Sequence, residues 1–433
     1  MKLSRLTSVF FATVVVSSLV FAVNSTVIAD GEGILIDENS FPDEAFRQYV
    51  STEIDDGDGV LSDEEISNTK EINCNYRDIG SLEGIGYFSA LETLSCGMND
   101  LNGLDLSGNP ELRYLYCGSN PLNGLDLSGN PELRYLHCCD THCTTLNVSN
   151  NTKLNELHCE ACSLTSLNLK NNGKLTYLYC PNNKLTSLDV SKNTKLDFIQ
   201  CEGNPITKLD VSRCKNLTTL WCGGNKLKTL ILNKKMQRLA CGDDTLTTLD
   251  ISNCPALNTT YRNNKKIVKS RIYHYYFPKD SEAEGYRSGD SYIYISKTCK
   301  IKYSKSAQWC EIGGNWYYMD AKGKLAKGWK KISKKWYYFN SKSGVMTTGV
   351  KKIGKYYYLF NDKGVMLKSG WKKDSNGNTY YLKKDGKAYT KKWAKKSGKW
   401  YYFGSNGTMV KGKSLKIGKK TYKFDSKGVC KNP

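Results

Sequence analysis

The stretch LRYLYCGSNPLNGLDLSGNPELRYLHCCD, residues 112–140, contains almost the same phrase twice. Cys117 and Cys138 stand 21 residues apart, at the same place in each copy. A fixed period of this length is typical of repeat architectures, in which each unit adds one coil to a solenoid. A single unit cannot bury its own apolar edge, so the stacking of neighbouring units must supply the core.

The period continues on both sides of this stretch. Units start at residues 91, 112, 133, 154, 175, 196, 217 and 236, with the phrases LETLSC, LRYLYC, LRYLHC, LNELHC, LTYLYC, LDFIQC, LTTLWC and MQRLAC. The pattern resembles the leucine-rich repeat, L-x-x-L-x-L-x-x-N-x-L, with cysteine in the third apolar position. The resemblance covers about residues 70–260, and it implies a solenoid whose leucines and cysteines form the core.

Nine cysteines occupy one position in successive units: Cys74, Cys96, Cys117, Cys138, Cys159, Cys180, Cys201, Cys222 and Cys241. We expect one inward column, because cysteine packs well as a small buried hydrophobe. Side chains in register on neighbouring strands point the same way, which suits disulfide torsions poorly. Disulfides and metal binding are the weaker alternatives. Leucine or asparagine positions of other units are taken by Cys143, Cys162, Cys214 and Cys254, whereas Cys139 fits no column.

The outward side chains of the predicted strands form a second pattern. In L-x-x-L-x-C the leucine and cysteine face inward, so the third and fifth positions face the concave surface. The candidate ligand-binding residues there are Tyr114, Tyr116, Tyr135, His137, His158, Tyr177, Tyr179, Phe198 and Trp221. An exposed aromatic stripe indicates a surface that a partner covers, either a protein or a glycan. The alternative is that the rings only stabilise the sheet through cross-strand contacts.

Ahead of the array, FPDEAFRQYVSTEIDDGDGVLSDEEI at residues 41–66 resembles an EF-hand-like loop between two helices. The resemblance implies calcium as a cofactor, with Gly59 at the turn. The implied ligands are Asp55, Asp56, Asp58, Ser62 and Glu65. The first ligand position falls on Ile54, so Asp55 serves only if the loop is one residue shorter. The alternative is a solvated acidic turn that caps the first apolar edge of the solenoid, and both roles are compatible.

The N-terminus has the layout of a secretory signal peptide. Lys2 and Arg5 precede the apolar run VFFATVVVSSLVFAV, and the small-residue site VIA follows at residues 27–29. We therefore expect cleavage after Ala29 and a secreted protein. A membrane anchor is the alternative, although the run is short for a span, and no later stretch is apolar enough to cross a bilayer.

The charge is divided unevenly along the chain. Residues 260–433 contain 42 of the 63 Lys and Arg and 10 of the 42 Asp and Glu, so they carry +32. The remainder carries −11, because the whole chain is +21. This split indicates separate modules, the second suited to an anionic partner.

The basic segment has its own repeat of about 20–22 residues, as in WKKISKKWYYFNSKSGVMTTG at 329–349 and WAKKSGKWYYFGSNGTMVKG at 393–412. Each unit contains two short strands around a Gly- or Lys-bearing turn, which predicts a β-hairpin. The segment resembles the choline-binding, or cell-wall-binding, repeat family. The resemblance covers about residues 308–430 and implies a hairpin solenoid in which aromatic side chains of successive units enclose a quaternary ammonium by cation–π attraction.

The resemblance implies two intact aromatic boxes. The first would combine Trp309 and Trp316 with Tyr338, and the second would combine Trp329 and Trp336 with Tyr358. Met346 stands in the methionine position of the family. Elsewhere the sequence departs from the pattern: Val350 and Ser414 replace the first tryptophan, and Thr379 and Thr421 replace the second. Lys423 stands where the third aromatic residue would fall after Trp393 and Trp400. Choline, a glucan and a phosphate-rich teichoic acid therefore remain alternative wall ligands, and a solenoid that only packs is the further alternative. Export argues against nucleic acid as the partner of this basic segment.

We predict a mainly β protein: a leucine-rich-repeat solenoid, then a β-hairpin solenoid of choline-binding type, with a small helical N-terminal cap. The divisions are a signal peptide at 1–29, an acidic EF-hand-like cap at 30–70, the array at 71–260, a β-rich connecting segment at 261–307 and wall-binding repeats at 308–433. Cys299 and Cys310 lie outside both repeats and are the best disulfide candidates, whereas Cys430 fits a core methionine position.

No motif of a known catalytic centre is present: H-E-x-x-H, G-x-S-x-G and a phosphate-binding loop are all missing from the sequence. We therefore expect a non-catalytic, adhesin-like surface protein. The hairpin repeats would hold it non-covalently on the cell wall, and the array would present its concave face to a protein or glycan. The alternative is a wall- or glycan-processing factor for which the repeats serve as the targeting module.

Overall fold

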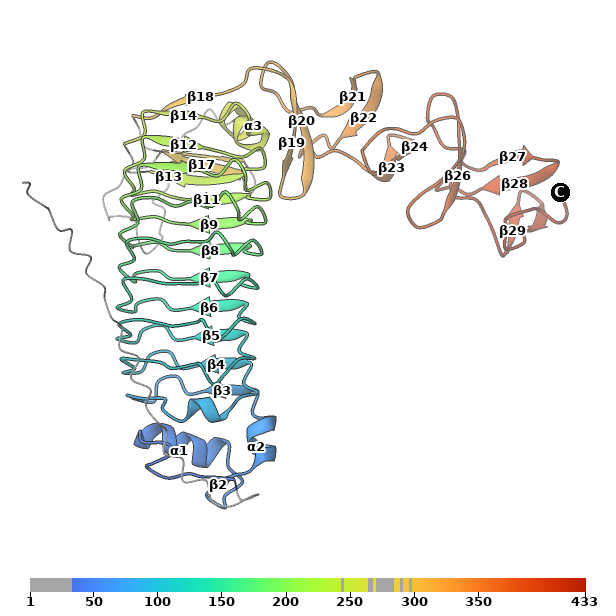
Figure 1. The fold of residues 1–433 in the computed structure, drawn as a ribbon. Helices are drawn as coiled ribbons and strands as arrows, with labels where there is room; N and C mark the ends of the chain where they lie inside the picture. Colours follow the sequence, from blue (N-terminus) through green and yellow to red (C-terminus); the bar gives the residue numbers. More distant parts are fainter. Residues whose placement is uncertain (1–32, 243–244, 264–267, 270–283, 289–290, 296–297) are drawn as a thin grey trace, which may run out of the picture.

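The computed structural model describes residues 33–242, 245–263, 268–269, 284–288, 291–295 and 298–433 (Figure 1). The expected signal peptide at 1–29 lies outside the described residues. The chain is mainly β, with a stack of coils followed by a run of β-hairpins, as the sequence predicts (Figure 1). The helices of the described residues are too short and too polar to serve as membrane spans.

A small helical cap closes the N-terminal end of the stack. It contains α1 (Glu44–Glu53) and α2 (Asp63–Asn68), together with β1 (Ile34–Leu35), which pairs antiparallel with β2 (Val60–Leu61). The Asp43 carboxylate accepts the Phe46 amide at the start of α1, which satisfies an orphan donor of the helix. Its second oxygen accepts the amides of Gly80 and Ser81, so the same side chain joins the helix to the first coil.

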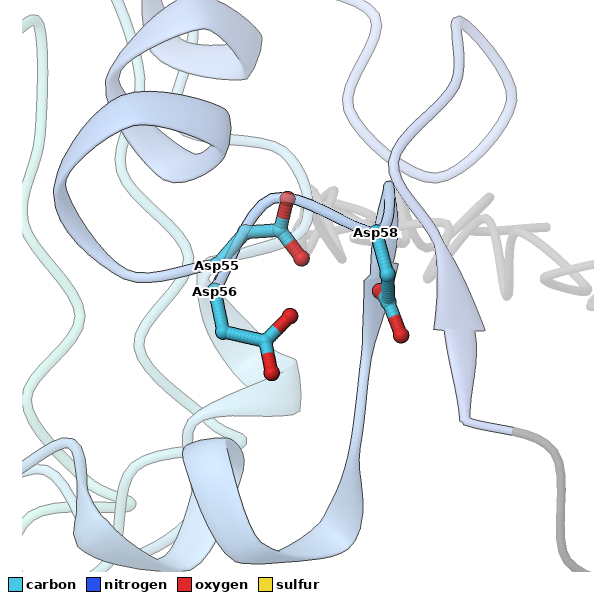
Figure 2. Close-up of side chains that lie close together, drawn as sticks. All are labelled: Asp55, Asp56 and Asp58. Atoms are coloured by element: carbon cyan, nitrogen blue, oxygen red, sulfur yellow. The ribbon is translucent and has the colours of Figure 1, made fainter.

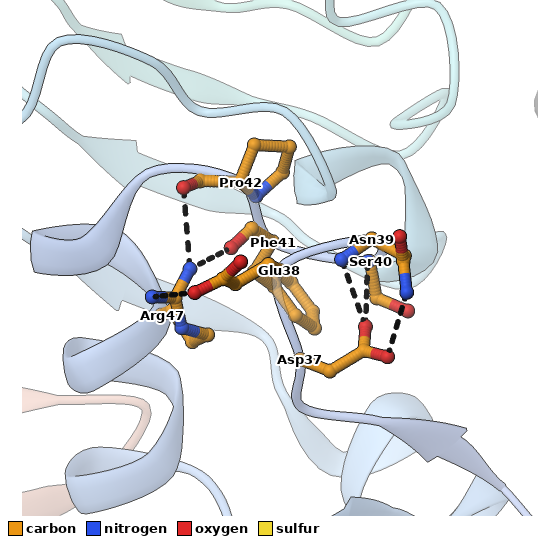
Figure 3. A network of polar contacts seen from close by, with 7 residues as sticks. All are labelled: Asp37, Glu38, Asn39, Ser40, Phe41, Pro42 and Arg47. Atoms are coloured by element: carbon orange, nitrogen blue, oxygen red, sulfur yellow. Dashed lines mark hydrogen bonds and ion pairs between the residues drawn. The ribbon is translucent and has the colours of Figure 1, made fainter.

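The turn that leads into α1 is fixed by two further side chains (Figure 3). Asp37 accepts the backbone amides of Asn39 and Ser40 at 3.0 and 2.9 Å, and these hydrogen bonds lower the pKa of Asp37. Arg47 donates to the carbonyl of Phe41 at 2.7 Å. The turn therefore places the fully buried Phe41 ring over the apolar end of the array.

The array is a stack of parallel strands, one from each coil. Its strands are β3 (Glu71–Asn73), β4 (Thr93–Ser95), β5 (Tyr114–Tyr116), β6 (Tyr135–His137), β7 (Glu156–His158), β8 (Tyr177–Tyr179), β9 (Phe198–Gln200), β11 (Thr219–Trp221) and β13 (Arg238–Cys241). Equivalent positions pair in register, as Leu115 pairs with Leu136. The central leucine or isoleucine of every strand is buried, and its neighbours are partly or fully exposed except at Thr219 and Ala240, which is the alternation that the repeat predicts.

The cysteine column is buried in this core, as predicted. All nine members are at most 1% exposed, and the structure carries them as thiols rather than disulfides. Burial raises the pKa of Cys74 to about 12, so this thiol stays protonated and unreactive. Cys143, Cys162, Cys214 and Cys254 are also buried at leucine or asparagine positions.

Buried asparagines hold neighbouring coils together. Asn120 donates to the carbonyls of Cys96 and Cys117, each at 3.0 Å, and accepts the amide of Leu101. Asn99, Asn183, Asn204 and Asn225 repeat this arrangement in other coils. Because an unpaired buried carbonyl is costly, this ladder explains why asparagine follows most of the strands; in two coils Thr141 and Cys162 take its place and bond to the Cys138 carbonyl.

The far side of the last coils carries short additional strands. They are β10 (Lys208–Asp210), which pairs with β12 (Thr229–Ile231), and β14 (Thr248–Asp250), which pairs with β18 (Lys300–Lys302). A single 3₁₀ turn, Ile85–Tyr87, lies between β3 and β4.

The connecting segment extends the array sheet. It contains α3 (Pro255–Asn263), β15 (Val268–Lys269), β16 (Glu284–Ser288) and β17 (Ser291–Ile295). β17 pairs in parallel with β13, so the segment adds a strand to the stack before the chain leaves it. Arg262 of α3 donates to the carbonyls of Ser304 and Ser306 and, at 2.7 Å, to that of Ala321, which ties the hairpin segment to the array.

The expected disulfide between Cys299 and Cys310 does not form. Cys310 is a buried thiol that packs against Ala256 of α3 and receives the hydroxyl of Thr259 at 3.3 Å. Cys299 instead packs against the core of the array. Cys310 lies within the first hairpin, and its neighbours are residues of α3 that are distant in sequence, so the sequence pattern gave no sign of its packing role. Cys430 is buried in the last hairpin cluster, consistent with the predicted core position.

The C-terminal segment is a series of two-stranded antiparallel hairpins (Figure 1). They pair β19 (Gln308–Ile312) with β20 (Asn315–Met319), β21 (Gly328–Ile332) with β22 (Lys335–Phe339), β23 (Gly349–Ile353) with β24 (Tyr356–Phe360), β25 (Gly370–Lys373) with β26 (Thr379–Leu382), β27 (Lys392–Lys396) with β28 (Lys399–Phe403) and β29 (Ser414–Ile417) with β30 (Lys420–Lys423). Each hairpin has a small core of its own or shares one with its neighbour.

Candidate functional site

The concave face of the array carries a continuous series of ring contacts. The Tyr116 ring lies 4.8 Å from Tyr135, measured between centroids. His158 stacks on Tyr179 at 4.1 Å with an interplanar angle of 10°. Further contacts join Tyr135 to His158, His137 to His158, Tyr179 to Phe198 and Phe198 to Trp221. Apart from Tyr114 and Tyr177, the predicted stripe residues therefore touch one another across strands, which supports the sheet as well as presenting a surface.

The series continues beyond the residues that the sequence singled out. Trp221 Nε1 donates to the Tyr292 hydroxyl at 2.6 Å, and the Tyr292 ring lies 5.1 Å from Tyr294. Both tyrosines belong to β17, outside the repeats. The alternating SYIYI of that strand was the available signal, because its two isoleucines face the core like the leucine and cysteine of a repeat strand.

Two outer tyrosines provide the exposed edge of the face. Tyr114 and Tyr177 are 39% and 37% exposed, whereas burial raises the pKa of Tyr135. His137 is partly buried, and this burial, together with the nearby His158, lowers its pKa. His158 bonds to the Glu156 carboxylate at 2.7 Å. The middle of the stripe is therefore packed, and Tyr114 and Tyr177, the first residues of β5 and β8, remain available to a ligand.

The acidic turn brings three of the five implied calcium ligands together. The carboxylate oxygens of Asp55, Asp56 and Asp58 lie within 4.8 Å of one another (Figure 2). Asp55 Oδ1 is buried and accepts no hydrogen bond. Three clustered carboxylates with an unsatisfied buried oxygen suit a hard cation that prefers oxygen ligands, such as Ca²⁺.

The other two implied ligands are engaged elsewhere. Glu65 accepts the backbone amide of Ser62 at 2.8 Å, and the Ser62 hydroxyl caps α2 in return. The second Glu65 oxygen accepts the amide of Asp56 at 2.8 Å. The Ser62 hydroxyl also donates to Glu65 at 2.6 Å, and this hydrogen bond, followed by those of the Ser62 and Asp56 amides, lowers the pKa of Glu65. Glu65 therefore closes a capping box that ties α2 to the acidic turn.

The second predicted aromatic box is assembled as expected. The Trp329 ring lies 6.2 Å from Trp336 at an interplanar angle of 87°, and 4.8 Å from Tyr358 of the next hairpin at 72°. The Trp336 and Tyr358 rings are thus both steeply inclined to the Trp329 ring, an aromatic cluster of the kind that attracts a quaternary ammonium. Trp336 is 42% exposed, so one side of the cluster is open to solvent. Tyr338 adds a fourth ring, 5.3 Å from Trp329.

The third member of the first box differs from the prediction. Trp309 contacts Tyr337 of the next hairpin at 4.9 Å, whereas Tyr338 packs in the second box. Adjacent residues of a strand point to opposite faces, so a register error of one residue selects the wrong tyrosine. Trp316 is 43% exposed on the hairpin that carries Trp309.

A further complete box lies at Trp393, where the sequence indicated a broken one. Trp393 lies 6.4 Å from Trp400 and 4.8 Å from Tyr422. The prediction that Lys423 occupies the third position is therefore wrong, for the same reason of register. At Trp371 the neighbour from the next hairpin is Tyr401, at 4.9 Å, and Thr379 stands where a second tryptophan would lie.

Lysines of the chain itself lie over several of these rings. Lys396 Nζ is 5.3 Å from the Trp371 centroid, Lys395 Nζ is 5.4 Å from that of Trp400, and Lys420 Nζ is 5.2 Å from that of Tyr422. Each contact is within the range of a cation–π interaction. The box at Trp329 has no such lysine within residues 298–433, all of which the structure describes.

Met346 packs between successive hairpins. It packs in the cluster around Phe339, and its amide donates to the carbonyl of Trp316 at 2.7 Å. A Cβ at Gly364 of the following unit would lie 2.2 Å from Met346 Sδ, and Gly364 has a positive φ of 72°. Methionine and glycine therefore interlock between successive units, so Met346 fixes the spacing of the boxes.

Comparison with known proteins agrees with this geometry. Residues 307–348, 347–393 and 390–429 match the family model described as the choline-binding repeat. Residues 307–429 are therefore choline-binding repeats, which supports association with the cell wall. No curated protein sequence matches the chain.

Several solved structures are similar to parts of this chain. CbpJ from Streptococcus pneumoniae is 33% identical over 29% of this chain and 42% of that chain, with a TM-score of 0.25. A leucine-rich-repeat protein of Leptospira interrogans is 26% identical over 43% of this chain and 52% of that chain, with a TM-score of 0.41. The functional domain of InlJ from Listeria monocytogenes, described as including a cysteine ladder, is 20% identical over 77% of this chain and 97% of that chain, with a TM-score of 0.30. This chain covers less than half of the length of CbpJ.

Proposed function

We propose that this chain, a leucine-rich-repeat solenoid followed by choline-binding repeats, is a secreted, non-catalytic binding protein of the cell surface. The hairpin repeats hold it on a cell-wall polymer without a covalent bond. The array projects its concave face to a second ligand, in an adhesin-like role. Calcium bound in the acidic turn strengthens the cap of the array.

The observation that carries this proposal is the box at Trp329. The Trp336 and Tyr358 rings are steeply inclined to Trp329, Trp336 is exposed, and within residues 298–433 no lysine lies over these three rings at cation–π distance. A quaternary ammonium placed there would contact three ring faces, a geometry that is strongest when the cation is desolvated. Choline on a wall polymer therefore fits this site better than a neutral glucan does.

The lysines of the tail contribute a second, weaker attraction. Residues 260–433 carry +32, so phosphate groups of a teichoic acid would be drawn to the same segment. This attraction acts over about 8 Å at physiological ionic strength and is screened by salt. Contact in the boxes depends far less on salt, so the two contributions can be separated by experiment.

The acidic turn is the proposed calcium site. Asp55, Asp56 and Asp58 would supply the ligands, and their mutual repulsion would be relieved by the cation. Because the turn lies between α1 and α2, which cover the first coil, the cation would strengthen the cap of the array.

Co-sedimentation of the full chain with isolated choline-containing cell walls tests the anchoring role. The wild type should remain on the walls in high salt, and Trp329→Ala combined with Trp336→Ala should weaken retention at low and high salt alike. Tyr356→Ala is the matched control, because Tyr356 is an exposed ring of the next hairpin. Loss of all binding in moderate salt, with no effect of the tryptophan substitutions, would show that the tail is only a polycation.

The same preparation separates binding from catalysis. Release of soluble sugar or peptide from the walls is measured after incubation with the full chain. No release above the background of wall alone is expected. Clear turnover would favour a wall-processing factor instead.

A further inference from the structure

A groove of about 640 Å³ runs along one edge of the concave face, the edge at which the strands begin. Its lining comes from five successive coils, at the first strand position and at the positions one and three residues before it. The lining residues are Tyr114, Arg134, Tyr135, Lys153, Asn155, Glu156, Lys174, Thr176 and Lys195. The groove is thus beside the aromatic series and separate from the choline-binding repeats.

The groove is a positive site on a negative part of the chain. Residues 1–259 carry −11, yet the groove has four cations and one carboxylate. Lys153 is paired with Glu132, which lowers the pKa of that carboxyl. In the described part of the chain, no ion pair engages Arg134, Lys174 or Lys195. Three cations are therefore available to a ligand.

The cations follow the repeat. Lys153, Lys174 and Lys195 occupy one position of three successive coils, at intervals of 21 residues. The strands that follow these lysines pair in register, so we expect the lysines to form a row beside the strand starts, with about 4.8 Å between neighbouring backbones. A row of this kind suits a linear ligand that carries regularly spaced negative groups.

The remaining lining residues indicate a ligand with hydroxyl groups. One oxygen of Glu156 is bonded to His158 at 2.7 Å, and a carboxylate only accepts hydrogen bonds, so a ligand that reaches its other oxygen must donate there despite its own negative charge. Thr176 donates to Asn155 Oδ1 at 3.0 Å, which leaves the Asn155 amino group directed to other acceptors. The Tyr114 ring, 39% exposed, and the Tyr135 ring beside it offer amphipathic faces for sugar rings.

We infer that this groove binds an acidic glycan, with carboxylate or sulfate groups on the lysine row and Arg134 and with sugar rings against Tyr114 and Tyr135. The inference rests on the presenting role proposed for the array and names its ligand class. An acidic peptide fits less well. The strands β5 to β9 are hydrogen-bonded on both sides, so they offer no free edge to an extended peptide.

Hydrogen exchange on the full chain tests this inference. A heparin-derived oligosaccharide, which is both sulfated and carboxylated, is added at physiological salt, and protection is followed in peptides from residues 134–200. Peptides from residues 308–433 report binding to the basic tail in the same sample, so the two segments are distinguished. Neutral dextran and poly-L-glutamate are the comparison polymers.

Heparin should protect the groove peptides, whereas dextran should not. Lys174→Ala with Lys195→Ala should weaken the groove binding about tenfold, which corresponds to about 1.4 kcal/mol, because two contacts to the anionic ligand are lost. The tail peptides should keep their protection in this variant. Lys170→Ala with Lys192→Ala is the matched control, because both lysines are exposed on the same coils outside the groove.

Three outcomes would overturn the inference. Equal protection by dextran would show that charge has no role, and equal or stronger protection by poly-L-glutamate would assign the groove to an acidic peptide. Protection that survives the groove substitutions would place the ligand elsewhere. None of these outcomes affects retention on cell walls, so failure here is distinguishable from failure of the anchoring proposal.

Discussion

A buried carboxyl makes the stability of the array dependent on pH. Glu202 is 2% exposed, and neither of its oxygens accepts a hydrogen bond of good geometry. Burial raises the pKa of Glu202 from 4.5 to about 7, and the nearby Gln200 side chain opposes this rise only in part. The folded coil therefore holds a proton that the unfolded chain releases.

The sign and the size follow from this difference. Below pH 4.5 the carboxyl is neutral in both the folded and the unfolded state, so its ionisation contributes nothing to the free energy of unfolding. Between 4.5 and about 7 only the unfolded state ionises, so stability falls as pH rises. A shift of this size corresponds to about 3 kcal/mol, all of it lost above the folded pKa. Glu202→Gln removes the titration, so it should gain about 2 to 3 kcal/mol relative to the wild type between pH ~5 and pH ~8.

Hydrogen exchange in peptides that span β9 and β11 measures this effect, because it reports the local opening free energy. The local opening free energy of Glu202→Gln should exceed that of the wild type by an amount that grows as pH rises. Glu111→Gln is the control at an exposed position and should follow the wild type. A gap that stays constant across the range would refute the buried, protonated carboxyl.

Three further predictions concern the cysteines, the acidic turn and the lysines of the tail. A maleimide should label Cys74, Cys96 and Cys117 only after denaturation and without any reductant, because these thiols are buried; a need for reductant would reveal disulfides. Calcium should raise the thermal stability of the cap in the wild type and not in Asp58→Asn, measured by calorimetry with magnesium as the control; equal shifts in both proteins would remove the calcium site. Lys396→Gln should allow choline to quench Trp371 more strongly, since the variant removes the ammonium that lies 5.3 Å from that ring; unchanged quenching would show that the lysine does not compete.

Much of the array could be predicted because its signal is repeated. Leu115 and Cys117 have equivalents in every coil, so one period fixes the inward side of all the strands. The outward residues then follow from alternation, as the contacts from Tyr116 to Trp221 confirm. The concave surface was therefore predictable without knowledge of the three-dimensional packing.

The remaining features depend on register or on contacts distant in sequence. The hairpin units differ in length by one or two residues, and a Tyr-Tyr pair such as Tyr337–Tyr338 offers two choices that point to opposite faces. Tyr292 lies outside the repeats and reaches Trp221 only after β17 joins the sheet. The groove was missed because Lys174 and Lys195 precede the strands, at positions where the repeat pattern specifies no residue type.

Calorimetric titration of choline chloride into the full chain tests the central claim most directly, with sodium chloride at equal ionic strength as the control. The account predicts saturable heat that exceeds the sodium chloride control and that loses a clear share in Trp329→Ala, while Tyr356→Ala behaves as the wild type. Heat equal to that of sodium chloride, or a full response in Trp329→Ala, would contradict the claim that the aromatic boxes hold this protein on the cell wall.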